Sequence, residues 1–99
     1  MNVKPSFRQA TVLDLANIVV LHADDTLGAA RDGSFDLARE QYLRAFAAIE
    51  ADPNNELWVV EDQNEIVGCF QLTFIPGLSR QGSTRCEIEA VRIASQRRG

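Results

Sequence analysis

The chain has 99 residues, with 10 Lys and Arg against 14 Asp and Glu, and a formal net charge of −4. This length is that of one domain, residues 1–99, and a hydrophobic share of 45% is ordinary for a globular protein. The acidic balance argues against a nucleic-acid binder, whose surface would be basic. The sequence shows neither a signal peptide nor an apolar run of transmembrane length. We therefore expect a cytoplasmic domain that binds neither nucleic acid nor membrane.

The first elements read as a strand at Ser6–Ala10 and a helix from about Val12 to Ala23. Thr11 and Asp14 have the spacing of a capping box, which predicts the start of this helix. Apolar side chains surround most of its circumference, so we expect it to pack against a sheet. His22 is the single histidine. We interpret it as a partly exposed residue at the helix end, and a direct catalytic role is the minor alternative.

A second helix is predicted from about Phe35 to Ala51, after a loop at Asp24–Ser34. Ser34 has the residue type of an N-cap. Tyr42 lies on the apolar face of this helix, since it shares helical spacing with Ala38, Ala45 and Ile49. The helix ends before Pro53, because a residue that precedes proline avoids the helical conformation.

Two strands follow, Glu56–Glu61 and Glu65–Phe74, and Asp62–Asn64 joins them as a hairpin with Asn64 in a left-handed conformation. The second strand is apolar on both faces, which predicts a central strand that is covered on both sides. Gly68 indicates a bulge or a close backbone approach there. The connection Ile75–Ser83 begins with exposed apolar residues, which favour a substrate contact or a dimer contact.

The two cysteines, Cys69 and Cys86, both lie in predicted strands. Neither belongs to a Cys-x-x-Cys motif or a Cys/His cluster, so no metal site is predicted. We expect both to be free thiols that act as small buried apolar residues.

The last stretch, Arg85–Gly99, reads as a strand that runs into a basic turn with glycine. Such a turn is a common seat for a phosphate, because backbone N–H groups converge there. The C-terminal fifth is locally basic on an acidic chain, which suits a compact anion. Its arginines are Arg80, Arg85, Arg92, Arg97 and Arg98. An ordinary solvated run of arginines is the alternative.

Residues 88–99 resemble the fourth strand and the start of the acetyl-CoA pyrophosphate loop in the GNAT superfamily of N-acetyltransferases. The loop of that family begins with Arg or Gln, and Arg98 matches this position, although a register that begins at Gln96 also fits. The resemblance continues upstream through Pro5–Thr11, Asn54–Asp62 and Ile66–Pro76. It implies an α/β (α+β) GNAT fold, in which helices flank a mixed, mostly antiparallel sheet. The chain is then truncated after the fourth strand, inside the loop.

The resemblance implies transfer of an acetyl group from acetyl-CoA to an amine. It points to Glu89 as general base, with Glu87 as the alternate or as a partner of the ammonium group. Both share strand parity with Val91 and Ile93, unless a bulge intervenes. Salt bridges to Arg85 or Arg92 are an equally weighted alternative for the two carboxylates.

The resemblance also assigns the cofactor and substrate contacts. The backbone of Val91, Arg92 and Ile93 would hold the pantetheine, and Arg97, Arg98 and Gly99 would begin the pyrophosphate loop. Residues near the substrate entrance would be Leu27, Phe35 and Tyr42, with the Asp24–Asp25 pair; core packing of the aromatic residues and a solvated turn for the aspartates are the alternatives. Phe74 is added as a substrate contact because it lies at the exposed apolar start of the following connection. The truncated sheet would have one open edge and one bare face. A homo-oligomer in which a partner chain covers them is predicted, while a longer chain that completes the sheet and a fragment without activity of its own stay open.

Two other functions remain open at this point. The first is a non-catalytic GNAT-like module that binds an acyl-CoA or a partner. The second is an unrelated small α/β interaction domain whose terminal Arg-Arg-Gly is a solvated tail. The sequence leaves the acceptor amine open, and the acidic residues at the presumed entrance favour a cationic small molecule.

Overall fold

The structure, a computed structural model, describes residues 4–23, 36 and 38–95. One four-stranded antiparallel sheet has the order β1-β2-β3-β4. Its strands are β1 (Ser6–Gln9), β2 (Asn55–Asp62), β3 (Glu65–Pro76) and β4 (Thr84–Ile93). The helical elements are η1 (Val12–Asp14), α1 (Leu15–Ala23), α3 (Arg39–Ala51) and α4 (Ser79–Gly82). The predicted strands and their order along the chain are therefore confirmed.

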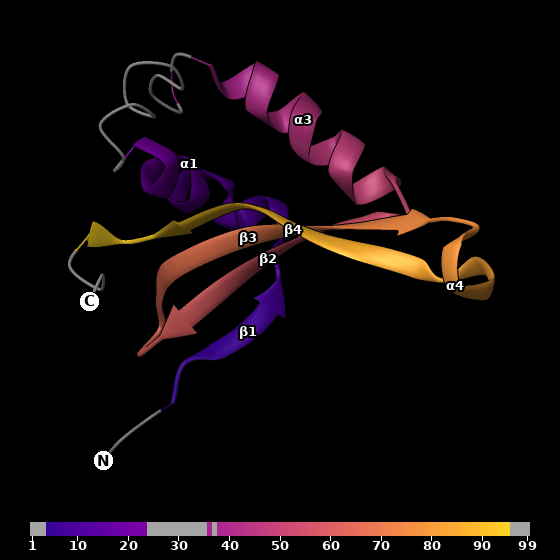
Figure 1. The fold of residues 1–99 in the computed structure, drawn as a ribbon. Helices are drawn as coiled ribbons and strands as arrows, with labels where there is room; N and C mark the ends of the chain where they lie inside the picture. Colours follow the sequence, from indigo (N-terminus) through magenta and orange to yellow (C-terminus); the bar gives the residue numbers. More distant parts are fainter. Residues whose placement is uncertain (1–3, 24–35, 37, 96–99) are drawn as a thin grey trace.

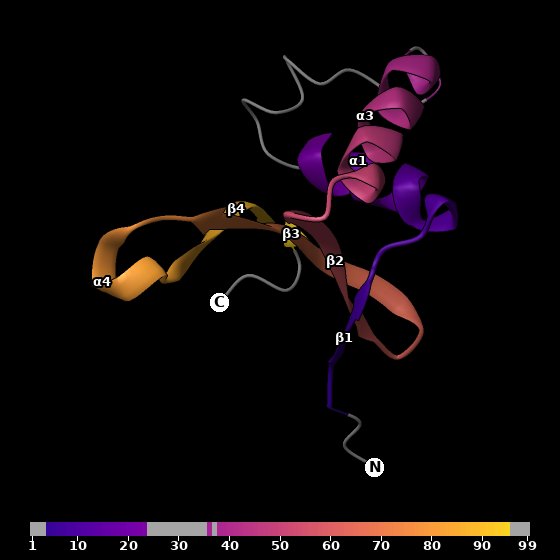
Figure 2. The same cartoon turned by 90° about the vertical axis from the view of Figure 1, so that its right-hand side faces the viewer.

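Helices α1 and α3 lie together on one side of the sheet (Figures 1 and 2). The core forms beneath them, and its centre is the cluster of Ile18, Leu21, Val59, Cys69 and Ala94, all no more than 6% exposed. Burial raises the pKa of the Cys69 thiol to about 11, so this cysteine is a packed apolar residue as predicted.

Strand β3 lies between β2 and β4, as its apolar pattern predicted. The prediction that it is covered on both sides is wrong for the described residues, where helices cover one face only. The other face carries an aromatic group, in which the ring of Phe70 stacks on Trp58 at 6.3 Å and meets the edge of Phe7 at 6.1 Å. Several large apolar side chains of this face are about half exposed or more: Phe7, Ile88, Val91 and Ile93.

The β2–β3 hairpin has the turn that the sequence indicated. Both Gln63 and Asn64 have positive φ, 54° and 66°, which matches the right-handed twist of the strands. A register shift follows near Gly68, where a Cβ atom would lie 3.3 Å from the carbonyl oxygen of Arg92. The shift moves Ile66 to the helical face, where it packs on the core instead of sharing a face with Phe70.

The predicted first helix is divided into a 3-10 turn, η1, and α1. The capping box is confirmed, since the N–H of Thr11 donates to the Asp14 carboxylate at 2.8 Å. Asp14 also accepts two hydrogen bonds from the Arg8 guanidinium, at 2.7 and 2.8 Å, and Arg8 donates Nε to Glu61 at 2.9 Å. This network joins β1, η1 and β2.

The buried Asp14 predicts an acid dependence of stability. Hydrogen bonds from Arg8 lower the pKa of the Asp14 carboxyl below its usual value. A depressed folded-state pKa contributes stability above the unfolded pKa, about 4, and this contribution disappears as the pH falls through the folded pKa. We expect Asp14→Asn to lower the free energy of unfolding by about 2 kcal/mol at pH 7, and by less in acid.

Urea unfolding of both chains between pH 7 and pH 3 measures this difference. Glu50→Asn, at an exposed position on α3, is the matched control and is expected to change little at either pH. A deficit for Asp14→Asn that stays constant across this range would contradict the assignment.

Helix α3 begins at Arg39 rather than near Phe35. The proposed cap, Ser34, lies outside the described residues. The C-terminal end agrees with the sequence, since Asp52 before Pro53 is extended.

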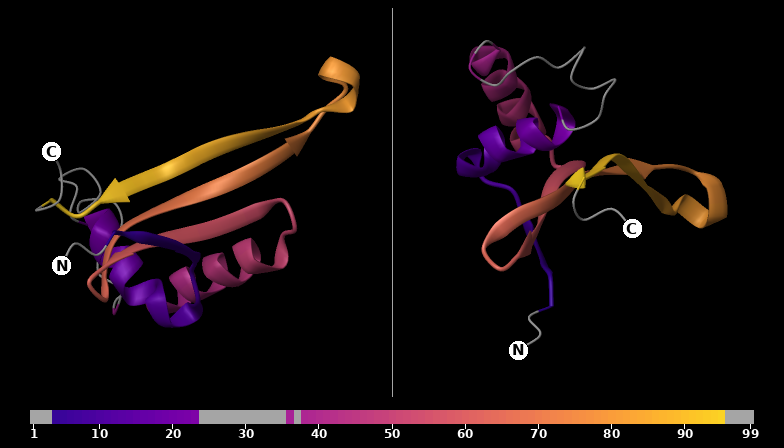
Figure 3. Two further views of the ribbon diagram at one scale, coloured as in Figure 1. Left: turned by 90° about the horizontal axis from the view of Figure 1, so that it is seen from below. Right: turned by 90° about the vertical axis from the view of Figure 1, so that its left-hand side faces the viewer.

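Strands β3 and β4 run on together, beyond the ends of β1 and β2, as a long hairpin that ends in the single turn α4 (Figure 3). Arg80 and Gln81 in this turn have positive φ, 52° and 64°. Cys86 lies on this hairpin and is exposed, so the prediction that it is buried is wrong. The paired ends of β3 and β4 extend beyond the rest of the sheet, so Cys86 lies outside the core.

Candidate functional site

A β-bulge in β4 is the centre of the candidate site. Gln71 pairs with Glu89 and Cys69 pairs with Arg92, so one extra residue is inserted in β4 between these pairs. Ala90 adopts a φ of 53° there, a conformation that L residues rarely adopt. The possibility of a bulge, raised from the sequence, is thus confirmed.

The bulge reverses the alternation of side chains between the first and second halves of β4. Residues opposite each other in antiparallel strands point to the same side, so Glu87 and Glu89 lie on the face of Thr73 and Gln71, which is the helical face. Ile93 pairs with Gly68 and lies on the other face. The shared parity of the two glutamates with Val91 and Ile93 is therefore wrong, because the bulge reverses the alternation.

A cavity of about 240 Å³ lies between α1, α3 and the sheet, beside the bulge. Its walls are mostly apolar, and Ile18, Phe46 and Leu57 are among the side chains that form them. Its polar lining comes from His22, Tyr42 and Gln71, and Ala90 itself lines the cavity. Apolar walls with a few polar groups are typical of a small-molecule site.

The two glutamates differ in their contacts. Glu87 lies 3.9 Å from the Arg85 guanidinium, with side chains 46% and 72% exposed, so this pair is weak. In the described part of the chain Glu89 forms no ion pair, and Nη1 of Arg92 donates to the carbonyl oxygen of Val91 at 3.0 Å. The salt-bridge alternative therefore fits Glu87 rather than Glu89.

The backbone beyond the bulge faces the outer edge of the sheet. Ala94 donates its N–H to Val67 on β3 at 2.9 Å. Backbone groups alternate sides along a strand, so those of Val91 are directed away from β3. No strand among the described residues pairs with this edge of β4. A ligand can therefore run along it as an added strand would.

Comparison with known proteins decides the family. The sequence matches the profile of the acetyltransferase (GNAT) family over residues 17–99. The chain belongs to the GNAT family. No curated protein matches it significantly.

Solved structures share this GNAT fold. A transcriptional regulator from Bacillus halodurans C-125 is 45% identical, with a TM-score of 0.87 over 97% of this chain and 64% of its own. A protein named as an acetyltransferase from Agrobacterium tumefaciens str. C58 is 26% identical, with a TM-score of 0.79 over 95% of this chain and 62% of its own.

A predicted acetyltransferase from Clostridium acetobutylicum, solved with acetyl-CoA, is 18% identical and has a TM-score of 0.66. The match covers 97% of this chain and 64% of that one. The present chain thus spans less than two thirds of the length of each of these three proteins. At this identity the likeness to the third protein shows the fold alone.

The structure brings together only part of the site that the sequence predicted. Tyr42 reaches the cavity and Glu89 lies beside it, whereas Phe74 shares the opposite face of the sheet with Phe70. Leu27, Phe35, Asp24 and Asp25 lie outside the described residues, as do Arg97, Arg98 and Gly99.

Sequence reasoning missed Gln71. Its signal was present, because Gln71 and Thr73 are polar positions that alternate with Phe70, Leu72 and Phe74 along β3. The apolar residues dominate the pattern of this strand, so these polar positions are easily overlooked.

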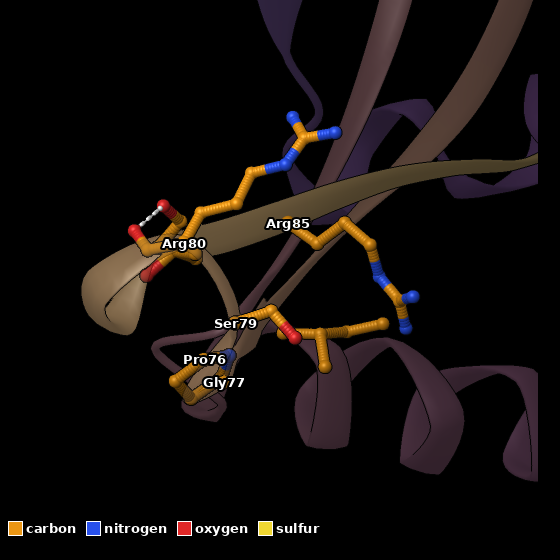
Figure 4. A pocket seen from close by; sticks show the side chains of 8 residues that line it. Pro76, Gly77, Ser79, Arg80 and Arg85 are labelled. Carbon is orange, nitrogen blue, oxygen red and sulfur yellow. Dashed lines mark hydrogen bonds between the residues drawn. The ribbon is translucent and has the colours of Figure 1, made fainter.

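A larger cavity, about 520 Å³, lies at the tip of the β3–β4 hairpin (Figure 4). Pro76, Gly77 and Ser79 line it, with Arg80 and Arg85. The two guanidinium groups lie apart instead of converging on one point, and Ser83 donates its hydroxyl to the carbonyl oxygen of Arg80 at 2.7 Å. The arrangement lacks a carboxylate or a nucleophile directed at a common ligand, so we place the chemistry at the bulge.

No helix among the described residues combines the length and apolar composition needed to cross a bilayer. The part of the chain that the structure describes holds no group of three metal-ligating side chains. A cytoplasmic location and a homo-oligomer stay predictions.

Proposed function

We propose that this protein is an N-acetyltransferase that transfers the acetyl group of acetyl-CoA directly to a primary amine. The acceptor lies in the cavity on the helical face, and acetyl-CoA lies along the outer edge of β4. Glu89 acts as the general base, and Glu87 is its alternate. Membership of the GNAT family supports acyl transfer with acetyl-CoA as the donor.

The reaction needs few groups. The amine nitrogen attacks the carbonyl carbon of the thioester, and a C–N bond forms as the carbonyl oxygen becomes an oxyanion. Collapse of this intermediate breaks the C–S bond and releases CoA as a thiolate that takes up a proton. Glu89 removes a proton from the amine, directly or through a water molecule. The backbone N–H of Val91 is directed to the same edge and would stabilise the oxyanion.

The cofactor contacts follow from the strand edge. Backbone groups of Val91 would hydrogen-bond the pantetheine, and the resemblance to the family adds Arg92 and Ile93 to this segment. Arg97, Arg98 and Gly99 would begin the pyrophosphate loop, a role that rests on the sequence match. Backbone N–H groups and two cations suit a diphosphate.

The bulge at Ala90 is the observation that supports this proposal most. Next to the inserted residue Glu89 lies on the helical face opposite Gln71, and the edge of β4 beyond the bulge is directed away from β3. An amine and a thioester that approach from these two directions meet at the bulge, where their reacting atoms can be aligned.

Two measurements on the full chain, including any residues that follow Gly99, test the proposal. Titration calorimetry measures acetyl-CoA binding, and a thiol assay measures CoA release with a panel of primary amines. We expect saturable binding and amine-dependent release of CoA. A chain that binds acetyl-CoA but never releases CoA above the rate of hydrolysis would contradict the proposal.

A second function has one observation in its favour. The 45% identical relative is named a transcriptional regulator, so a GNAT-like module that binds an acyl-CoA without turnover is the alternative. It predicts binding of acetyl-CoA that Glu89→Gln leaves unchanged, and no amine that is acetylated.

A further inference from the structure

A directed chain of hydrogen bonds runs from the end of α3 to the cavity. Asp52, the C-cap residue, accepts a hydrogen bond from Nδ2 of Asn55 at 2.8 Å. Oδ1 of Asn55 in turn accepts Nε2 of Gln71 at 2.9 Å and the hydroxyl of Thr73 at 2.7 Å. The chain therefore joins the α3–β2 turn to the middle of β3.

The direction of this chain follows from its first member. A carboxylate only accepts hydrogen bonds, so Asn55 must present its amide nitrogen to Asp52 and its oxygen to β3. Gln71 must then present its own nitrogen to Asn55. Its Oε1 atom is left on the far side of the amide, away from Asn55. The position of an acceptor oxygen is thus set by a residue two hydrogen bonds away.

Gln71 lies where an amine would have to bind. It lines the cavity, and Glu89 is its partner across the strand pair. Opposite residues have Cβ atoms roughly 5 Å apart, so Oε1 and the Glu89 carboxylate can contact the same nitrogen. One acceptor then holds an N–H of the amine while the other takes the proton that the reaction releases.

The remaining lining of the cavity indicates which substituent the amine carries. Besides Gln71 the lining has His22 and Tyr42 as its polar side chains, and the rest of it is formed by apolar walls such as Ile18, Phe46 and Leu57. A polyamine or an amino sugar would leave polar groups unpaired against them, which is costly. An aliphatic or aromatic substituent would be buried there with a gain in affinity.

We propose that Gln71 is the acceptor-binding residue of this site, that Asn55 and Asp52 position it, and that the preferred substrate is a primary amine with an apolar substituent. This inference rests on the proposed acetyltransferase function. The two proposals can be tested separately, because amine binding can be measured without turnover.

The test uses the full chain and 3-methylbutylamine as the probe, with ethanolamine for comparison. Calorimetry in saturating CoA measures amine binding, and initial rates give KM for each substrate. We expect 3-methylbutylamine to bind more tightly than ethanolamine by about tenfold or more, since each buried CH₂ contributes roughly fourfold. Gln71→Leu is expected to weaken amine binding by about tenfold, with KM for acetyl-CoA unchanged.

A double-mutant cycle separates positioning from structure. If Asn55 acts through Gln71, Asn55→Ala raises the dissociation constant of the amine about threefold to tenfold in the parent chain and has no effect in the Gln71→Leu chain. A merely structural role would lower thermal stability and weaken binding equally in both backgrounds. Glu50→Ala, on the exposed side of α3, is the control for the substitutions.

Three results would overturn the inference. They are an absence of amine binding by the parent chain, ethanolamine bound as tightly as 3-methylbutylamine, and Gln71→Leu with unchanged amine affinity. Failure of the proposed function looks different. A chain that binds the amine through Gln71 but never acetylates it supports the binding site and contradicts the acetyltransferase activity.

Discussion

Glu89→Gln is expected to lower kcat for amine acetylation by about 10²–10⁴-fold, the contribution of a positioned general base. Glutamine keeps the size of the side chain and its hydrogen bonds but cannot take a proton. Binding of acetyl-CoA should be unchanged, because the strand edge that would hold it lies beyond the bulge. Steady-state kinetics with both substrates varied measures the effect.

The pH profile tests the role of Glu89 more sharply than the rate alone. In the parent chain kcat/KM should fall in acid, because the amine becomes an ammonium ion that cannot attack the thioester. In Glu89→Gln this dependence should remain while the rate is lower at every pH, because the amide cannot accept the proton of the amine.

Glu87→Gln is the matched control for this substitution. Glu87 lies two residues away on the same face of β4, and its contact with Arg85 is weak. We expect its activity to stay near that of the parent chain. A Glu89→Gln chain that keeps the parent rate across pH would refute the assignment, and a loss confined to Glu87→Gln would transfer the role of base to Glu87.

Ile18→Ala is expected to lower the free energy of unfolding by roughly 2–5 kcal/mol, because it removes buried methyl groups and leaves a cavity. Ile18 is 4% exposed and packs in the cluster that joins α1 to Val59 and Cys69. A loss of this size is a large fraction of the stability of a small domain, about 5–15 kcal/mol.

Val20→Ala is the control, because Val20 lies on the same helix and is 64% exposed. Alanine is the better helix former, so this change should be neutral or slightly stabilising. Urea unfolding that follows both far-ultraviolet circular dichroism and tryptophan fluorescence measures the two variants. Equal losses would contradict the orientation of α1.

Much of the fold could be predicted locally. The Thr11–Asp14 capping box, the turn at Gln63–Asn64 and the proline after Asp52 each act through neighbouring residues, so their effect is visible in a short window. The motif of residues 88–99 identified the family for the same reason, since a phosphate loop is built from consecutive residues. The profile match confirmed this family over residues 17–99.

The candidate site could not be predicted from a short window, because it is formed by contacts between residues that are distant in the sequence. Glu89 and Ile93 lie on opposite faces because of one extra residue at Ala90, and a bulge exists only relative to the partner strand. The alternation of β4 could not show it, and extending that alternation placed Glu89 with Val91. Phe74 was assigned to the substrate entrance because of the loop beside it, but strand parity directs it to the other face.

The sequence by itself determined the family, the order of strands along the chain and the residue types available for acyl transfer. Only the tertiary structure decided which of these residues meet. Gln71, Asn55 and Asp52 are brought together by the pairing of β2 with β3 and by the end of α3, which no local pattern encodes. The physical reason is that propensities and caps are set by a few neighbouring residues, whereas register and facing are set by the packing of the whole sheet against α1 and α3.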